Sequence, residues 1–507
     1  GAAVSADARE LARRLTLSYL LASTAILAAS GLLGVVLRFS QAGTVRVGDN
    51  FWYAAMTAHG LGAFVGWAAF AVMGFSWWLL AGLGFELRPF AAAMARVTFW
   101  LMVAGVAGVV VTTVLLGFAG SWVFLYPLPF YAAGQWGDVT TALFSFSVLL
   151  SGLAIVTWCL GIVHTVVGPA LKAVSRNPVN RFLTSIGFGY LWPRRFATNP
   201  TPVPYALIPL GVIGIDMIVA TLPLAGLLVF MIVQSFAEVS IDPLLAKNIL
   251  WWFGHPVVYL LLFPAVALYY HLIPQYAKRP LVAGNVIALA WVIAVIANVV
   301  VWAHHVYLDF PDGSPQAAFN LAAQPMTFAL TIPSALSLYS LGFTIYRSDF
   351  EWNAASTALF LGLVSWLLAG LSGVVNATIA FDAVVHNSLW VVGHFHHMAL
   401  VNIGLVIFAA TYHFLPPLTG RRLWSETAAR WHVWLTFSTG TVMSALWIWQ
   451  GLEGAPRRFS ILPEAYEGLA VAAVPTVVVL AAAQVLYFLN VILTLRGPKL
   501  RPAEALA

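Results

Sequence analysis

The strongest constraint on the fold is a succession of long apolar stretches. A helix needs about 20 mostly apolar residues to span a membrane, and twelve stretches of the chain meet this requirement. Charged residues make up only 8% of the 507 residues, against about a quarter in soluble domains, so a soluble protein is excluded. The sequence predicts one all-α integral membrane domain over residues 1–507, a bundle of about 12 transmembrane helices. The stretches are residues 16–37, 52–82, 97–120, 141–170, 206–235, 248–272, 281–301, 319–346, 355–380, 386–414, 430–451 and 468–495.

The basic residues are distributed unevenly between the connections. Cytoplasmic connections of membrane proteins carry an excess of Lys and Arg. The N-terminus, the connections after the even-numbered stretches and the C-terminus hold 19 of the 24 basic residues, which predicts an even number of spans and two cytoplasmic termini. Because the basic residues are scattered rather than clustered on one face, we expect no nucleic-acid partner. The single cysteine, Cys159, lies in an apolar run and is interpreted as a buried, inert thiol.

Histidines occur where apolar side chains are expected. The segment LWVVGHFHHM, residues 389–398, places His394 and His396 two positions apart within a membrane span. Each residue of a helix advances about 100°, so these two imidazoles point about 200° apart. They therefore face opposite sides of one helix and do not chelate a single ion. The spacing suits two flat cofactors, one on each side, and haem iron commonly takes an imidazole as an axial ligand.

Two further motifs bring imidazoles to the ends of spans. In WWFGHPVVYL, residues 251–260, His255 and Tyr259 share one helix face, and Pro256 disturbs the backbone directly after the histidine. In VWAHHVYL, His304 and His305 are adjacent where the seventh stretch ends, and a frayed end lets both turn toward one point. Three imidazoles from two segments suit copper or another late first-row metal.

The fourth motif lies in the second stretch. His59 is followed by Gly60 and Gly62, which let a bulky group approach the backbone closely. Taken alone, this histidine fits equally well as a ligand or as a side chain hydrogen-bonded to a neighbouring helix. Taken in order, H-G, W-F-G-H-P-x-x-Y, H-H and G-H-F-H resemble subunit I of the haem–copper oxygen reductases, the cytochrome c oxidase superfamily. The resemblance covers residues from about 50 to 460.

The resemblance implies a function and a role for each motif residue. It implies a terminal oxidase that reduces dioxygen to water and pumps protons, with two haems and a copper ion, copper B, enclosed by the bundle. His397 matches no family position and is interpreted as structural. Tyr259 resembles the tyrosine covalently joined to a copper ligand, here His255, and would give an electron and a proton to dioxygen. The implied ligands are His59 and His396 for the low-spin haem, His394 for the high-spin haem, and His255, His304 and His305 for copper B.

Charged residues near the predicted outer surface suit the haem carboxylates. Arg457 and Arg458 lie in a connection otherwise poor in basic residues, and guanidinium groups pair with carboxylates in a bidentate manner. Asp382 and His386 are spaced by one helical turn at the start of the tenth stretch. We expect this pair near a propionate of the high-spin haem, where it would briefly hold a pumped proton. The alternative is a solvated start of the helix.

The proton route identifies a branch of the superfamily. The largest branch has a glutamate in G-H-P-E-x-Y, and this chain has Val257 there, so the channel that ends at that glutamate is not expected. The eighth stretch contains no lysine but carries hydroxyl groups, which with Tyr270 are spaced to relay protons. This pattern is similar to the B-type, or ba-type, branch. The alternative is that small hydroxyl residues pack membrane helices closely. The expected route is Tyr270, Ser337, Ser334 and Thr331.

The resemblance also implies partners and leaves alternatives. We expect a subunit II carrying a dinuclear copper centre, cytochrome c or a quinol as electron donor, membrane lipid, and a prokaryotic plasma membrane as location. We expect a b-type low-spin haem and an a-, o- or b-type high-spin haem. One alternative is a nitric oxide reductase of the same superfamily, although such reductases lack the tyrosine that Tyr259 represents. The other is a proton-coupled secondary transporter, which would leave the histidine spacing unexplained.

Overall fold

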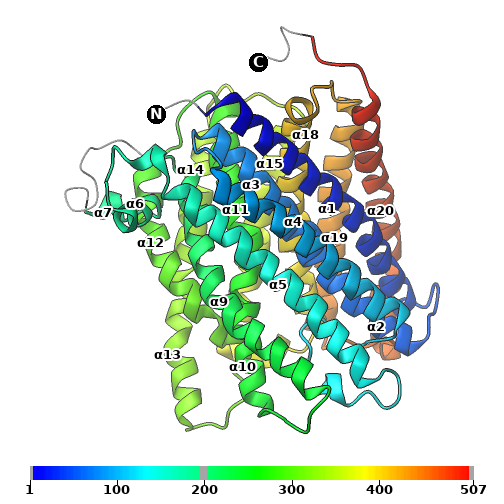
Figure 1. Cartoon of the computed structure of the whole chain (residues 1–507). Coiled ribbons are helices and arrows are strands. Elements are labelled where there is room, and N and C mark those ends of the chain that lie inside the picture. Colours follow the sequence, from blue (N-terminus) through cyan, green and yellow to red (C-terminus); the bar gives the residue numbers. More distant parts are fainter. Residues whose placement is uncertain (1–3, 193–202, 502–507) are drawn as a thin grey trace.

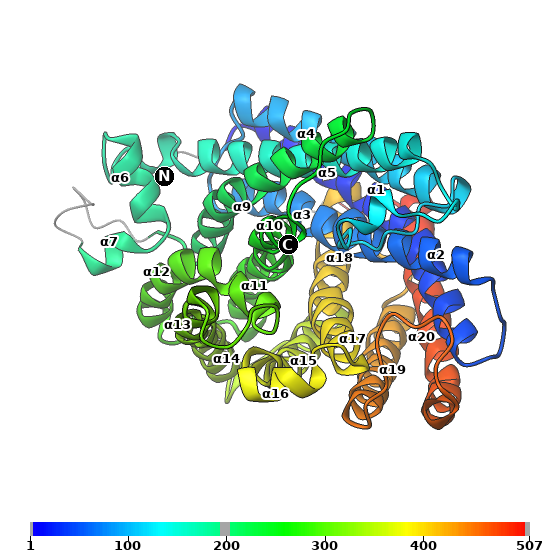
Figure 2. The ribbon, with the colours of Figure 1, turned by 90° about the horizontal axis from the view of Figure 1, so that it is seen from below.

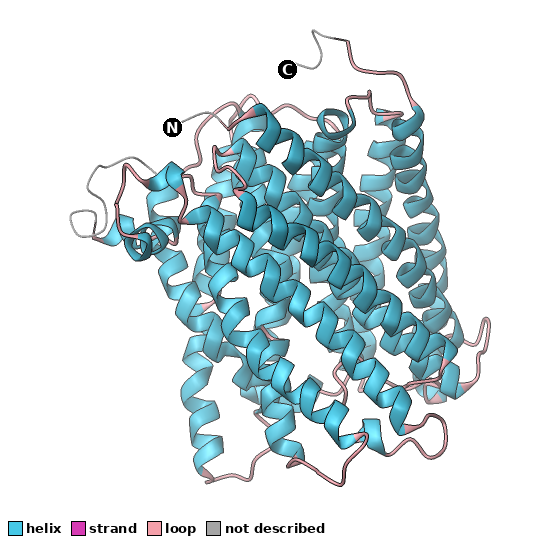
Figure 3. Cartoon of the chain, viewed as in Figure 1, coloured by secondary structure: helices cyan, strands magenta, loops and turns pink. Residues whose placement is uncertain are grey.

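The protein is a helical bundle in which long helices run roughly side by side (Figures 1 and 3). The computed structural model describes residues 4–192 and 203–501. Across these ranges, eleven helices are long and apolar enough to cross a membrane. The predicted all-α membrane fold is therefore confirmed. The membrane-spanning segments are Ala6–Gln41, Asp49–Gly82, Pro89–Leu115, Asp138–Leu171, Leu207–Gln234, Pro243–Ala277, Gly284–Val306, Pro315–Ile345, Ala354–Ala377, Leu389–Thr419 and Glu464–Arg496.

The predicted eleventh span, residues 430–451, which is absent from these eleven, is also a long helix of the bundle. It is α19 (Glu426–Leu452), which packs against α17 (Leu389–His396) and α20 (Glu467–Arg496). Trp, Ser, Thr and Gln side chains interrupt its apolar sequence, so it is less hydrophobic than the other eleven. The count of twelve rests on this helix, which is long enough to cross a membrane but falls short in apolarity.

Several spans consist of consecutive helical segments. The second comprises α2 (Asp49–Leu61), the π-helical η1 (Gly62–Ala69) and α3 (Phe70–Gly82). Short π-helical segments inside membrane helices are frequent at functional sites. The other segments are α1 (Ala6–Gln41), α4 (Pro89–Val110), η2 (Val111–Leu115), η3 (Leu128–Phe130), α5 (Asp138–Val166), η4 (Pro169–Leu171), α6 (Pro178–Ser185), α7 (Phe188–Leu191), α9 (Leu207–Gln234), α10 (Pro243–Gly254), α11 (Pro256–Ala277), α12 (Gly284–Val300), η5 (Val301–Val306), α13 (Pro315–Ala329), α14 (Thr331–Ile345), α15 (Ala354–Ala377), α16 (Ile379–Val385), η6 (His397–Ile403), α18 (Gly404–Thr419) and η7 (Glu464–Tyr466).

Three spans form the interior of the bundle. Viewed from below, α3, α11 and α18 lie inside a rim of other helices (Figure 2). The most apolar windows of the spans Asp49–Gly82, Pro243–Ala277 and Leu389–Thr419 are 89%, 83% and 78% buried, against 28–56% for the other eight. These three spans carry His59, His255, and the pair His394 and His396. Three of the four histidine motifs therefore lie on the helices that face protein rather than lipid, and the fourth, His304 and His305, ends the half-buried span Gly284–Val306.

The observed helix break at Pro256 matches the prediction from the sequence, whereas the break before α17 does not. As predicted, Pro256 begins a new helix, so His255 lies at the junction of α10 and α11. The tenth stretch was predicted to begin at residue 386, with Asp382 and His386 on it, and this was wrong. Asp382 lies on the separate short helix α16, and α17 begins only at Leu389, after Ser388 caps it. The break coincides with the polar residues His386, Asn387 and Ser388, which the predicted stretch had included.

Candidate metal and haem centre

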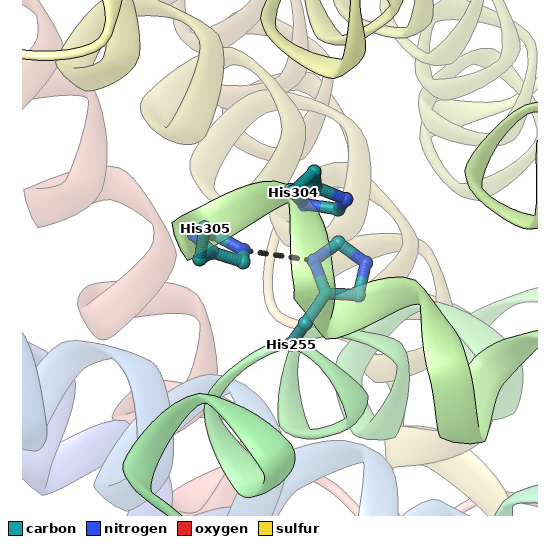
Figure 4. A group of neighbouring side chains, drawn as sticks. All are labelled: His255, His304 and His305. Atoms are coloured by element: carbon teal, nitrogen blue, oxygen red, sulfur yellow. Dashed lines mark hydrogen bonds between the residues drawn. The ribbon is translucent and has the colours of Figure 1, made fainter. Parts of the chain in front are cut away.

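Three histidines form a cluster on one side of the bundle interior. His255 at the α10–α11 junction faces His304 and His305 on η5 (Figure 4). One ligating nitrogen from each lies within 4.8 Å of the others. The Nδ1 of His255 and the Nε2 of His305 share a hydrogen bond of 3.0 Å, and the buried Nε2 of His255 has no partner.

The surroundings of this cluster hold its rings in place. The indole of Trp251 stacks on His305 with ring centres 3.9 Å apart and planes 3° apart. Tyr259 lies one turn from His255, with ring centres 4.8 Å apart. The predicted frayed end is confirmed, because the two adjacent histidines lie in the tighter turns of a 3₁₀ segment rather than a regular α-helix. Three neutral nitrogen donors in a buried site fit copper or another late first-row metal.

A second pair of imidazoles lies farther along the interior. His59 of α2 and His396 of α17 face each other with ring centres 6.1 Å apart and planes 11° apart. Two metal–nitrogen bonds of about 2 Å each would place ring centres roughly 6 Å apart. His59 Nδ1 donates to the carbonyl of Ser30 at 2.7 Å, and His396 Nδ1 donates to that of Val392 at 2.8 Å. These bonds leave each Nε2 free for a metal, as outer-shell partners of ligating histidines do.

His394 points to the other side of α17, as predicted from its spacing. Its Nδ1 lies 2.9 Å from the carbonyl of Ala369 and 2.9 Å from the hydroxyl of Ser372, both on α15. The ring passes so close to Gly373 that a Cβ at that position would lie 2.7 Å from His394 Cε1. Gly34 has the same relation to His59 on α1, where a Cβ would lie 2.5 Å from His59 Cε1. Glycine at these two positions makes room for the two imidazoles.

One cavity connects all of these groups. It has a volume of about 1150 Å³, above the roughly 300–1,000 Å³ of a pocket for one small ligand. Gly31 and Gly370 line it with no atom within 4 Å of their Cβ positions, so both backbones are open to a flat group. The cavity therefore fits two haems as well as a copper ion. His59, His255, His304, His305, His394 and His396 all line it.

The predicted charge partners lie at one end of the cavity. Arg457 and Arg458 line it and are half-buried, and Arg457 Nε has no hydrogen-bond partner. Burial, together with the neighbouring charge of Arg458, lowers the pKa of Arg457 to about 9, although Asp382 partly opposes both effects. Asp382 is 2% exposed and lies 3.0 Å from His386 Nδ1. The two arginines thus present half-buried positive charge that forms no ion pair among the described residues.

Arg38 was missed by the sequence analysis. It lies on α1, 3% exposed, and lines the cavity beside Trp447. Its guanidinium donates to Gln450 at 2.6 Å and to Gln41 at 3.2 Å. A single arginine at the predicted outer end of the first stretch was the available signal, but it was counted only as a loop charge.

The predicted proton route is brought together in part. Tyr270 and Ser337 share a hydrogen bond, and Trp291 Nε1 donates to the Tyr270 hydroxyl at 3.1 Å. Ser334 lines the cavity and is half-buried. Thr331 also lines the cavity, but it is exposed and its hydroxyl donates to the carbonyl of Phe328. The structure records no contact between Thr331 and the Tyr270–Ser337 pair within the ranges it describes.

Three other residues from the sequence analysis lie outside the cavity wall. His397 begins the π-helical η6, is 5% exposed and is absent from the cavity lining. Cys159 is a buried free thiol on α5, as predicted. Val257, which occupies the place of a glutamate in the largest branch, is 3% exposed and apolar.

Comparisons with known proteins agree on one family. The family model "Cytochrome C and Quinol oxidase polypeptide I" matches residues 14–495. Cytochrome c oxidase subunit 1 of Thermus thermophilus is 31% identical over 341 residues, 62% of this chain and 60% of that protein. The subunit 1 of Synechocystis sp. is 26% identical over 405 residues, 80% of this chain and 69% of that protein. The chain thus spans about three fifths of the first relative's length.

A solved structure shares the fold. It is described as a heme-copper terminal oxidase dimer and superimposes with a TM-score of 0.79 at 22% sequence identity. The match covers 97% of this chain and 85% of that one.

Proposed function

Because the chain belongs to the cytochrome c and quinol oxidase polypeptide I family, we propose that it is the catalytic subunit of a haem–copper terminal oxidase. In this proposal it reduces dioxygen to water in a prokaryotic plasma membrane and couples the reaction to proton uptake and pumping. The observation that carries the proposal is the arrangement of imidazoles on α17. His396 faces His59, and His394 points the opposite way into the same cavity as the three-histidine cluster.

Each histidine has one role in this proposal. Their Nδ1–H groups donate to backbone carbonyls in the three haem ligands, which fixes the tautomer and directs Nε2 at the iron. His59 and His396 would hold the low-spin haem, His394 the high-spin haem, and His255, His304 and His305 copper B. When bound, these groups supply the electron transfer and the dioxygen chemistry.

The side chains around the metals control protons and water. The phenol of Tyr259, one turn from His255, would hold a proton and an electron for O–O cleavage. The mostly apolar lining of the cavity excludes bulk water from the reacting atoms. The Tyr270–Ser337 hydrogen bond supports a hydroxyl route for protons, continued toward the site by Ser334 and Thr331. A single hydroxyl route without a glutamate at Val257 is the pattern of the B-type branch.

Charge at the other end of the cavity completes the site. Arg457 and Arg458 would pair with haem propionates, because their buried guanidinium groups face the cavity. The Asp382–His386 pair, with 3.0 Å between carboxylate and imidazole, would take up a proton close to these propionates. Electrons would arrive from cytochrome c, or from a quinol, through a subunit II with a dinuclear copper centre. We propose a b-type low-spin haem and an a-, o- or b-type high-spin haem.

The alternatives are weaker on the same observations. A nitric oxide reductase would lack the tyrosine that stands one turn from His255. A secondary transporter would leave the parallel imidazoles of His59 and His396 and the open glycine faces of the cavity without a purpose.

The test is an optical and elemental analysis of the protein purified from its native membrane. Reduced-minus-oxidised spectra with and without carbon monoxide are expected to reveal two haems, of which one binds carbon monoxide. Metal analysis is expected to give one copper for two irons. A third iron in place of copper would move the assignment to the reductase. A protein without haem and metal would overturn the proposal and favour the transporter.

A further inference from the structure

A carboxyl group lies inside the bundle, apart from the cavity. Asp216 is on α9, within a membrane-spanning segment, and is 2% exposed. Asn298 of α12 donates a hydrogen bond from Nδ2 to Asp216 Oδ2 at 3.0 Å. Ionisable side chains at membrane depth are costly to keep and mark functional sites. The function proposed above gives this carboxyl no role.

The hydrogen bonds around the pair favour a neutral acid. Asn298 is fully buried, and its Oδ1 has no partner. In residues 4–192 and 203–501, no ion pair involves Asp216. An ionised Asp216 would be a buried charge without a counterion. A protonated Asp216 has an O–H that can donate to Asn298 Oδ1, so acid and amide form a pair with two hydrogen bonds, and the unpartnered oxygen is satisfied.

The pair lies between the proposed hydroxyl route and the copper ligands. Trp291 and Asn298 are seven residues apart on α12, so they lie on the same face of this helix, about 10 Å apart. Trp291 Nε1 holds the hydroxyl of Tyr270 at 3.1 Å. Asn298 is therefore two turns beyond that contact, and η5 continues from it toward His305.

A second contact brings α9 to the same level as the site. Trp252 Nε1, on the helix that ends beside His255, donates to the carbonyl of Val219 at 3.0 Å. Val219 lies one turn of α9 beyond Asp216. The titratable group that interacts electrostatically with Asp216 from the neighbouring α5 is the buried thiol of Cys159. The helix that carries the carboxyl is thus in direct contact with the helix that ends beside His255.

We propose that Asp216 is a neutral, proton-holding carboxylic acid that exchanges its proton in step with reduction of the metal site. This inference rests on the proposed function. Its O–H bond breaks when the proton leaves toward the site, and it reforms with a proton from the side of Tyr270. No electron passes through the carboxyl. Asn298 is a positioning residue that holds the acid in place and accepts its hydrogen bond.

The test is infrared difference spectroscopy of the complete purified enzyme, reduced minus oxidised. A band from the C=O stretch of a protonated carboxyl is expected to change on reduction and to disappear in Asp216→Asn. In Asn298→Ala the band is expected to shift to higher frequency, because the carboxyl loses its hydrogen bonds. Thr221→Val is the matched control, since it removes another buried polar side chain of α9, 1% exposed and without a hydrogen-bond partner, and should leave the band unchanged.

The outcomes separate this inference from the proposed function. Suppose the haem spectra are normal but the carboxyl band does not change on reduction, or is still present in Asp216→Asn. This result would overturn the inference about Asp216 and leave the proposed function intact. If the Asp216→Asn protein does not bind haem, the test is the position of the carboxyl band in Asn298→Ala. A band that does not shift in that variant would overturn the inference about Asp216. A protein without haem would overturn the proposed function, whereas an Asp216 band in absolute spectra of that protein would still establish the neutral acid.

Discussion

The imidazole rings of His59 and His396 lie nearly parallel, 11° apart, with their centres separated by 6.1 Å. They come from α2 and α17, and hydrogen bonds to Ser30 and Val392 fix both rings from behind. Nothing in either helix alone requires this alignment. It follows from the approach of α1 to α2, which brings Gly34 against the His59 ring.

That contact makes Gly34 a sensitive position. In Gly34→Ala the new methyl group would lie 2.5 Å from His59 Cε1, so the imidazole must move. Alanine stabilises a helix relative to glycine by about 1 kcal/mol. Any loss of haem in this variant therefore results from displacement of the His59 ring. We expect loss of the low-spin haem spectrum while the carbon monoxide-binding haem remains. Gly226→Ala is the control, because no atom lies within 4 Å of its Cβ position, and an equal loss there would contradict the argument.

Gly373 is expected to affect the other haem, because it lies against His394 rather than His59. Alanine at this position would place a methyl group 2.7 Å from His394 Cε1 and push the ring away from its bonds to α15. We expect loss of carbon monoxide binding with retention of the low-spin haem spectrum. Gly342→Ala on α14, where the Cβ position is free of neighbours within 4 Å, is expected to keep both spectra. If Gly373→Ala removed both haems, His394 and His396 would not serve separate groups.

The Tyr270–Ser337 pair provides a third test. In Ser337→Ala the Tyr270 hydroxyl keeps only the indole of Trp291 as a partner. We expect oxygen reduction to slow by roughly 10- to 100-fold, at or below the lower end of what a positioned proton donor contributes. Haem spectra should stay unchanged. Ser365→Ala removes another buried hydroxyl, one that bonds only its own helix, and should keep the full rate. Equal rates in the two variants would exclude the route.

The directions of several candidate ligands could be predicted because they depend on local geometry. The two-residue spacing of His394 and His396 fixes opposite directions on any helix, and Pro256 ends α10 wherever that helix lies. The location of His59, His255, His394 and His396 within apolar spans follows from the sequence in the same way.

The rest depends on contacts between distant segments. Asp216 and Asn298 are 82 residues apart, and Arg38 meets Gln450 across 412 residues. No periodicity within one helix reveals such a pair. The polar residues His386, Asn387 and Ser388 mark the break before α17, and the start of that helix is fixed by the capping hydrogen bond that Trp390 N donates to the Ser388 hydroxyl.

Arg457 gives a prediction whose sign depends on the haem. Without haem, its half-buried charge has no anion, and burial lowers its pKa to about 9. A cation whose folded-state pKa is lowered destabilises the fold at every pH below that value, and the penalty fades as the pH rises above it. In protein made in haem-deficient cells, Arg457→Leu should therefore raise the free energy of unfolding by about 1 kcal/mol. This gain should shrink above pH 9.

With haem bound, the same substitution should destabilise. The propionate would lose its partner and remain buried, which costs 3–5 kcal/mol in fully buried pairs and about 2 kcal/mol at a half-buried site. We expect haem to leave roughly 30-fold faster, measured by transfer to an excess of an apo-haem protein. Arg46→Leu removes an exposed arginine paired with Glu467 on the same side, where surface pairs contribute about 0–1 kcal/mol, so both measurements should barely change. A substitution at Arg457 that destabilises haem-free and haem-loaded protein equally would show that this guanidinium supports the loop rather than the haem.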